Sequence, residues 1–129
     1  MFHTKWENPE DSIGECLCEI RVKSRPRFFW AATGPALELW TTEIQGKVQE
    51  WLNASGKIFP EPVGRSMYMF GKRKEKAQPI ILFCGEKDSR KEAMEIVNDG
   101  LREEYPGVIT GERSLPPELG SDFQELPTQ

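Results

Sequence analysis

The chain has 129 residues, of which 37% are hydrophobic and 29% are charged, and its formal net charge is −4. These values predict one globular domain that buries a single core without disulfides. They exclude a membrane-spanning helix, because the chain lacks an apolar run of about 18 residues, and its first residues lack the order of a secretory signal.

The first third of the sequence predicts a lead-in and a β-hairpin. Residues 1–12 are polar, and we expect them to form an irregular lead-in. Residues 14–23 alternate between apolar and charged side chains, which is the pattern of a half-buried strand. Its apolar face consists of Cys16, Cys18, Ile20 and Val22. A break at residues 24–26 and an aromatic run at residues 28–31 predict the second strand of the hairpin.

A long helix is predicted next. Residues 33–35 read Thr-Gly-Pro, which places proline at the first helical position, where no hydrogen bond is lost. Apolar side chains then recur at steps of three and four residues, at Leu37, Trp40, Ile44, Val48, Trp51 and Leu52. This stripe predicts a helix that ends near Ser55 and Gly56, with Trp40 and Trp51 as anchors of the core.

Two strands follow a linker that spans residues 58–65 and is rich in proline and glycine. Residues 66–70 predict a short strand and residues 79–84 an apolar one, joined by a charged turn at residues 71–78. Because the second strand is apolar throughout, we expect it to be buried on both faces, with Cys84 at its end.

The last predicted elements are a helix and a strand. Ser89 and Glu92 have the spacing of a capping box, which indicates the start of a helix. Tyr105-Pro106-Gly107 ends this helix, because a residue before proline avoids the α region. Residues 108–110 can then supply a final strand, and residues 114–129 form an acidic tail with prolines that we expect to be mobile.

The coarse order is therefore β-β-α-β-β-α-β. It predicts an α+β or α/β fold, in which a single mixed sheet of about five strands packs against two main helices. The domain covers residues 13–113, between the lead-in and the tail.

Residues 64–115 carry a further pattern: an apolar strand that starts with proline and ends in cysteine, an arginine-led helix, and Tyr-Pro-Gly before an aliphatic pair. Here these are Pro79 to Cys84, residues 90–93, and residues 105–109. The segment resembles one that recurs in uncharacterised proteins of filamentous ascomycete fungi. The resemblance implies a lineage-restricted module and favours an interaction or regulatory role, but it implies no activity.

The spacing of Cys84 and Arg90 raises the question of an enzyme. A cysteine six residues before an arginine, between a buried strand and a helix, is the arrangement of cysteine-dependent phosphatases. However, Glu86 and Asp88 would place negative charge in a loop that must hold a dianion, and Lys91 stands where such enzymes have serine or threonine. We therefore expect a core cysteine before a capped helix, and no catalytic residues beyond these two weak candidates.

Metal and cofactor sites are not expected. His3 is the single histidine, so a histidine triad is excluded. His3 could in principle complete a zinc site with Cys16, Cys18 and Cys84, but Cys-x-Cys within a strand is not a usual zinc spacing. Glycine-rich phosphate loops are absent, so we expect no nucleotide cofactor. Three cysteines in a chain of this length are typical of a reduced intracellular protein of the cytoplasm or nucleus.

Charge is distributed unevenly along the chain. Residues 20–91 carry fourteen basic and seven acidic side chains, whereas acidic side chains outnumber basic ones in residues 1–19 and 92–129. Two basic groups stand on predicted turns: Lys72, Arg73, Lys74 and Lys76 on one, and Arg21, Arg25 and Arg27 around the other. If both turns emerge at one end of the sheet, they would form a patch that binds phosphates. Otherwise they are two solvated hairpin tips.

Three functions follow, in order of preference. The first is a non-catalytic protein-interaction or regulatory module, which meets a protein partner through exposed apolar side chains or associates with itself through an edge strand. The second is anion or nucleic-acid binding through the basic turns. The third is a phosphatase-like enzyme that uses Cys84 and Arg90. None of the three implies a membrane partner.

Overall fold

The computed structural model describes residues 6–119, and their architecture confirms the predicted fold class. Five strands form one mixed sheet in the order β1-β2-β3-β4-β5. The first four strands pair antiparallel, and β5 pairs parallel to β4. The strands are β1 (Ile13–Val22), β2 (Arg25–Ala32), β3 (Val63–Gly71), β4 (Gln78–Gly85) and β5 (Ile109–Arg113).

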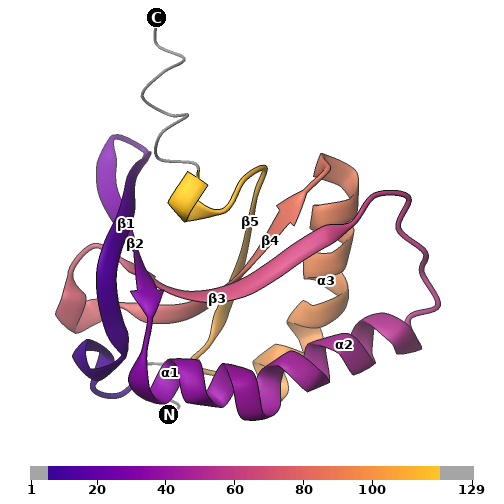
Figure 1. Ribbon diagram of the computed structural model, residues 1–129, viewed down its shortest axis with the longest axis horizontal. Coiled ribbons are helices and arrows are strands. Elements are labelled where there is room, and N and C mark those ends of the chain that lie inside the picture. The colour runs from indigo at the N-terminus through magenta and orange to yellow at the C-terminus, as the bar shows by residue number, and fades with distance from the viewer. Residues whose placement is uncertain (1–5, 120–129) are drawn as a thin grey trace, which may run out of the picture.

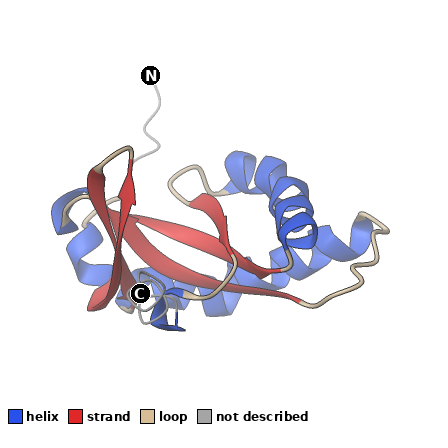
Figure 2. Cartoon of the chain, turned by 90° about the horizontal axis from the view of Figure 1, so that it is seen from above, coloured by secondary structure: helices blue, strands red, loops and turns tan. Residues whose placement is uncertain are grey.

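Two helical segments cover one face of this sheet (Figures 1 and 2). The first consists of α1 (Gly34–Leu39), a π-helical turn η2 (Trp40–Ile44) and α2 (Gln45–Ala54), and the second is α3 (Lys87–Glu104). The hydroxyls of Thr41 and Thr42 donate to the carbonyl oxygens of Leu37 and Glu38. Such bonds compete with the helical ladder, which accounts for a wider turn at this point.

Each inner strand contributes side chains to two cores, one on each face of the sheet. Met67 and Met69 of β3 pack under the helices, whereas Tyr68 between them packs on the opposite face. In β4, Ile81 and Phe83 point to the helices, and Ile80 and Leu82 point away from them. The alternation follows from the two-residue period of a strand.

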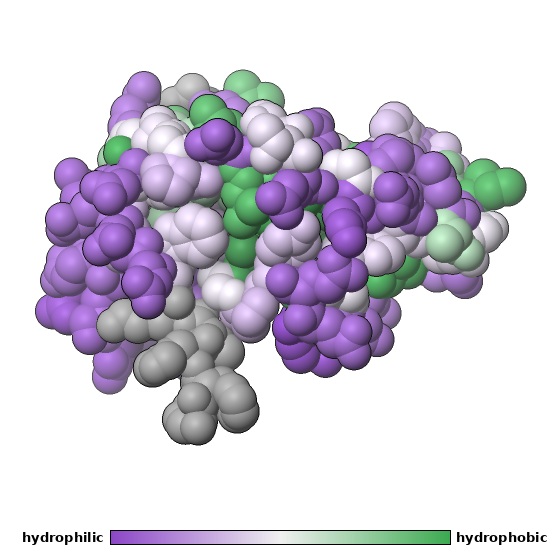
Figure 3. Space-filling model, turned by 90° about the horizontal axis from the view of Figure 1, so that it is seen from below, coloured by the Kyte–Doolittle hydropathy of each residue, from purple (hydrophilic) through white to green (hydrophobic). Residues whose placement is uncertain are grey.

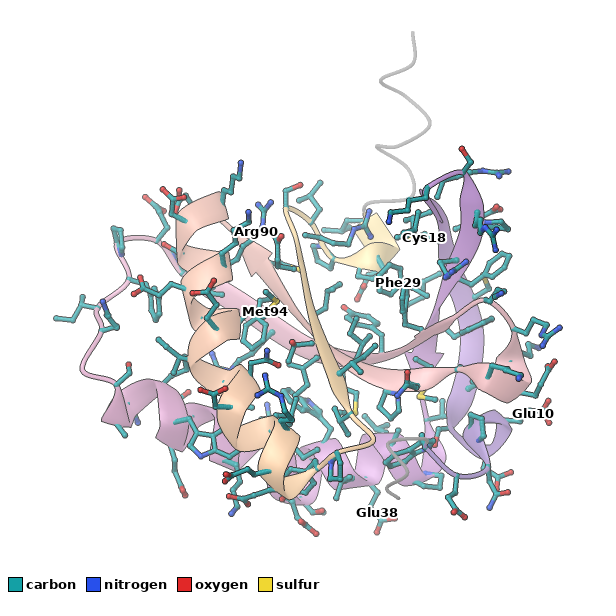
Figure 4. All side chains as sticks on the ribbon, turned by 180° about the vertical axis from the view of Figure 1, so that it is seen from behind. Glu10, Cys18, Phe29, Glu38, Arg90 and Met94 are labelled. Atoms are coloured by element: carbon teal, nitrogen blue, oxygen red, sulfur yellow. The ribbon has the colours of Figure 1, made fainter. Side chains whose placement is uncertain are left out.

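The face without helices is curved, because its first and last strands approach each other across it. The guanidinium of Arg113 in β5 lies 3.5 Å from the sulfur of Cys18 in β1 and 5.4 Å from the centre of the Phe29 ring. Figure 4 shows Cys18 and Phe29 on this face. Residues 114–119 cover part of it, with Pro117 fully buried and Glu118 accepting a hydrogen bond of 2.9 Å from the Tyr68 hydroxyl. Residues 120–129 of the predicted mobile tail lie outside the described residues.

Strand β1 differs from its predicted alternation. Cys18 is buried as expected, but Cys16 is exposed, so the prediction that both share an apolar face is wrong. The register between β1 and β2 shifts twice, between Ile13 and Cys16 and again between Cys16 and Cys18. Such β-bulges insert an unpaired residue and reverse the face of the side chains on one side of it.

The two tryptophans of the first helical segment occupy different environments. Trp40 is 5% exposed and anchors the core as predicted, whereas Trp51 is only half-buried and packs at the edge of the same core. Trp51 lies against Gly100 of α3, where an added Cβ would stand 2.6 Å from the indole. This glycine therefore sets how closely α2 approaches α3.

We expect the two helical glycines to respond oppositely to alanine. A Cβ at Gly46 in α2 meets no atom within 4 Å, so Gly46→Ala should stabilise the protein by about 0.5–1 kcal/mol through helix propensity. Gly100→Ala should destabilise it by about 1–3 kcal/mol, because the indole of Trp51 must move. Urea unfolding of both variants measures the difference, and equal stabilities would show that α2 does not pack on α3 through Trp51.

Tyr68 should make stability depend on pH in the alkaline range. Burial, together with the hydrogen bond to Glu118, raises the pKa of Tyr68 above its ordinary value of 10.0. A raised folded-state pKa stabilises the fold fully below about pH 10, and this contribution is lost as the pH rises further. Between about pH 9 and 11, the wild type should therefore lose more unfolding free energy than Tyr68→Phe. Parallel slopes for the two proteins would contradict this.

Candidate functional site

Cys84 stands at the end of β4, where the structure corrects its predicted burial. The apolar run is buried through Phe83, but Cys84 is only half-buried. Desolvation raises the pKa of the Cys84 thiol, although the charge of Arg113 partly opposes this shift. A catalytic cysteine needs the opposite shift, because the thiolate is the nucleophile.

Arg90 is held by two partners within the protein. Its Nε donates to a carboxylate oxygen of Glu112, and its Nη1 donates to the carbonyl oxygen of Gly85 at 2.9 Å. The ion pair with Glu112 is largely buried, since the two side chains are 16% and 23% exposed. A phosphate at this guanidinium would have to compete with the carboxylate of Glu112.

The amides that precede Arg90 are occupied as well. Helix α3 begins at Lys87, two residues before the predicted capping box, and its N-cap is Glu86. The Glu86 carboxylate accepts hydrogen bonds of 3.2 Å and 2.9 Å from the amides of Asp88 and Ser89, which lower its pKa. The chain thus fills its own helix-terminal anion position, and residues 84–90 form a capped helix start.

The two basic turns emerge at separate places. Strand twist carries the β1–β2 tip to the top of Figure 1, whereas the β3–β4 turn lies at the lower left. Arg21, Arg25 and Arg27 stand on or beside the first turn, and Lys72, Arg73, Lys74 and Lys76 on the second, which contains the short helix η3 (Lys74–Lys76). Sheet curvature therefore keeps the two groups from forming one patch.

Acidic residues surround the second basic turn. The short helix η1 (Pro9–Ser12) packs against η3, and Arg73 forms an ion pair of 3.0 Å with Glu75. The β1–β2 tip has fewer such contacts, since Arg21 lies 3.9 Å from Glu19 and Arg27 bonds only to the carbonyl oxygen of Pro26 among the described residues.

The contact between η1 and η3 creates an acidic cavity with a volume of about 520 Å³. The residues that line it are Trp6, Glu7, Asn8, Pro9, Glu10, Asp11 and Glu75. Glu7, Glu10 and Asp11 have no ion-pair partner among the residues that the structure describes. The indole Nε1 of Trp6 is buried and likewise lacks a hydrogen-bond partner there. Figure 4 labels Glu10 at this end of the molecule.

Three contacts hold η1 in place. The buried Ser12 hydroxyl accepts a hydrogen bond of 3.0 Å from the amide of Ala36, and the Ser12 carbonyl accepts one of 2.8 Å from Thr33. Gly34 has a φ of +50°, and a Cβ there would lie 2.4 Å from the Asp11 carbonyl oxygen. Residues 9–12, assigned from the sequence to an irregular lead-in, are thus fixed against the start of α1.

Sequence reasoning missed this cavity as a site. The excess of acidic side chains in residues 1–19 was the available signal, but Glu75 joins the cavity only through the turn that η3 forms. Within residues 6–119, acidic, cysteine and histidine side chains do not gather in threes as a metal would require. In the same range, each helix is too short or too polar to cross a membrane.

No protein-family model, curated protein or solved structure matches the chain significantly. The resemblance of residues 64–115 to fungal proteins therefore stays a prediction. The assignment of function rests on the geometry of the described residues.

We expect no phosphatase activity from Cys84. The raised pKa of the thiol and the engaged guanidinium of Arg90 predict that wild type and Cys84→Ser hydrolyse p-nitrophenyl phosphate at the same background rate. Hydrolysis by the wild type that Cys84→Ser abolishes, with an unchanged circular dichroism spectrum, would contradict this reading.

Proposed function

We propose that this protein is a non-catalytic interaction module, and that its acidic cavity binds a lysine- or arginine-containing segment of a partner protein. The observation that supports this most is the combination of four carboxylates and one tryptophan around a single cavity. Its volume of about 520 Å³ lies within the range of about 300–1,000 Å³ that is typical of ligand pockets.

Charge is the first part of the argument. Among the described residues Glu75 has a cationic partner, whereas Glu7, Glu10 and Asp11 have none. These three carboxylates line the cavity, so a cationic side chain can pair with any of them without breaking an ion pair. Each exposed pair contributes at most about 1 kcal/mol, so several must act together for measurable affinity.

The tryptophan is the second part. Trp6 is partly buried and packs against the core under the helices, so its indole is a fixed wall of the cavity. A cation near the face of a tryptophan ring gains about 0.5–1 kcal/mol at exposed sites and about 2 kcal/mol when it is desolvated. A guanidinium or ammonium group therefore suits this cavity better than a neutral side chain.

Apolar contacts support this proposal less than charge does. The large apolar side chains that are exposed come from separate parts of the fold: Val22, Leu37, Ile58 and Leu119. Figure 3 shows apolar surface on one face as a narrow central strip and a few small separate areas among hydrophilic side chains. The sequence predicted a partner bound through exposed apolar side chains, but on this face these side chains do not join into a broad patch.

A separate partner fits better than a second copy or a nucleic acid. The basic β1–β2 tip of one copy could enter the acidic cavity of another, but this contact is head-to-tail and would form open chains of molecules. Edge pairing through β1 is hindered by its bulges and its charged side chains. The four carboxylates repel phosphate groups, so nucleic acid is disfavoured at this cavity.

The test uses a fluorescein-labelled nonapeptide of alternating arginine and glycine, and the same peptide with citrulline in place of arginine. The arginine peptide should bind at low salt and weaken as salt approaches about 0.15 M, because exposed charges are then screened. Glu10→Gln combined with Asp11→Asn should weaken binding about fivefold or more. Fluorescence anisotropy measures both affinities.

A matched control removes the same charge elsewhere. Glu95→Gln combined with Glu103→Gln neutralises two exposed carboxylates of α3 and should leave the affinity unchanged. Equal weakening by both double variants would show that binding depends only on the net charge of the protein. Equal binding of the citrulline peptide would show that the positive charge of arginine is not required. Concentration-dependent growth in sedimentation velocity would instead identify a second copy as the occupant.

A further inference from the structure

A second cavity is lined by a half-buried arginine, Arg65, which forms no ion pair with the acidic residues that the structure describes. Arg65 belongs to β3, although the sequence assigned it to the preceding linker. It shares the helix-covered face of β3 with Val63 and Met67, and its register partner in β4 is the fully buried Phe83. The period of the strand therefore directs a guanidinium toward α2, where apolar side chains are expected.

The polar contacts of Arg65 leave part of its guanidinium unused. Its Nη2 donates to the Gln49 side-chain oxygen on α2. Its Nε is buried and has no hydrogen-bond partner among the described residues. Burial lowers the pKa of Arg65, and no neighbouring carboxylate opposes this shift. A buried donor without a partner is costly, so the hydrogen bonds that the protein itself offers this guanidinium are incomplete.

The cavity beside Arg65 has a volume of about 210 Å³, with one polar end and one apolar wall. Gln49 and Asn53 of α2 stand with Arg65 at the polar end, and Leu52, Phe59 and Val63 supply apolar surface. Lys57 also lines the cavity, but its Nζ lies 2.9 Å from a carboxylate oxygen of Glu92 in α3. Lys57 therefore already has a carboxylate partner, whereas Arg65 has none among the described residues.

We propose that this cavity binds a small monocarboxylate, whose carboxylate accepts hydrogen bonds from Arg65 and whose hydrocarbon part lies against Leu52, Phe59 and Val63. The planar guanidinium offers Nη–H groups from its two terminal nitrogens in a fork that matches the two oxygens of a carboxylate. The volume corresponds to about seven water molecules at about 30 Å³ each, which limits the ligand to a short chain or a single ring.

A phosphate fits this cavity less well. One unpaired cation balances a single negative charge, whereas a phosphate dianion would leave a second charge uncompensated. Glu61 also lines the cavity and repels any anion, but it repels a dianion about twice as strongly as a monocarboxylate. The apolar wall has no role in binding inorganic phosphate, but it contributes about 25 cal/mol for each Å² of hydrocarbon that a carboxylic acid buries.

This site is independent of the acidic cavity. It lies where α2 runs into the loop of residues 55–62, at the right of Figure 1, whereas η1 and η3 lie at the left. Its ligand carries the opposite charge. The two proposals can therefore fail separately.

The test titrates sodium butyrate into ¹⁵N-labelled protein and follows the Nε–H signal of Arg65 and the side-chain amides of Gln49 and Asn53 by NMR. Butyrate should give saturable shifts with a dissociation constant of about 1 mM or weaker, as expected for so small a ligand. Butyramide, which has the same size without the charge, should give no shift at the same concentrations.

Two variants and a control complete the experiment. Arg65→Lys keeps the charge but loses the fork and should bind butyrate about tenfold more weakly. Arg65→Met should not bind it at all, while Arg102→Lys changes an exposed arginine of α3 and should leave binding unchanged. The wild-type comparison of butyrate with butyramide stays decisive if Arg65→Met fails to fold.

Three results would overturn the proposal. The first is the absence of a saturable shift up to about 100 mM butyrate, which would show that the cavity holds only water. The second is an equal response to butyramide, which would remove the role of the charge. The third is tighter binding of inorganic phosphate than of butyrate, which would assign the cavity to another class of anion.

Discussion

Strand β4 must be buried on both faces, and the rest of the architecture follows from this requirement. Residues 80–83 are four consecutive large apolar side chains, and each is at most 4% exposed. Two of them pack under the helices, and the other two pack on the opposite face. At about 25 cal/mol for each Å², leaving either face open would forfeit several kcal/mol. The chain covers one face with helices and the other by curving the sheet and adding residues 114–119.

That curvature decides which functions remain possible. A flat meander would bring the β1–β2 and β3–β4 turns to the same end of the sheet, where their basic side chains could combine. Because the sheet curves until Arg113 reaches Cys18, the turns diverge, and the β3–β4 turn meets η1 instead. The same contact that divides the basic residues creates the acidic cavity, so one feature of the fold disfavours phosphate binding and favours a cationic partner.

Local patterns were enough to predict most of the elements. The Thr-Gly-Pro start of α1 and the buried run before Cys84 depend on neighbours in sequence, and the structure confirms them. The apolar stripe is confirmed from Trp40 to Leu52, except that Trp51 is half-buried, and Leu37 at its start is exposed. The bulges near Cys16 and the N-cap Glu86 were missed, because each depends on a choice between alternatives of similar energy. Cavities are harder still to predict from sequence, because they form only after distant segments have packed. Glu75 and Glu10 line the same cavity, and Arg65 bonds to Gln49, although neither pair is close in sequence.

Arg65 shows how a candidate binding residue can be recognised once the structure is known. A methionine or leucine at this position would continue the pattern of Val63 and Met67 and would need no partner. An arginine there loses part of its hydration and makes one side-chain hydrogen bond, to Gln49, and replacing partly buried ionic groups by apolar ones is often neutral or stabilising. Stability alone therefore gives no reason for a guanidinium in this place. A ligand that pairs with it would supply one, which is why this strand position, rather than the more numerous exposed charges, points to a binding site.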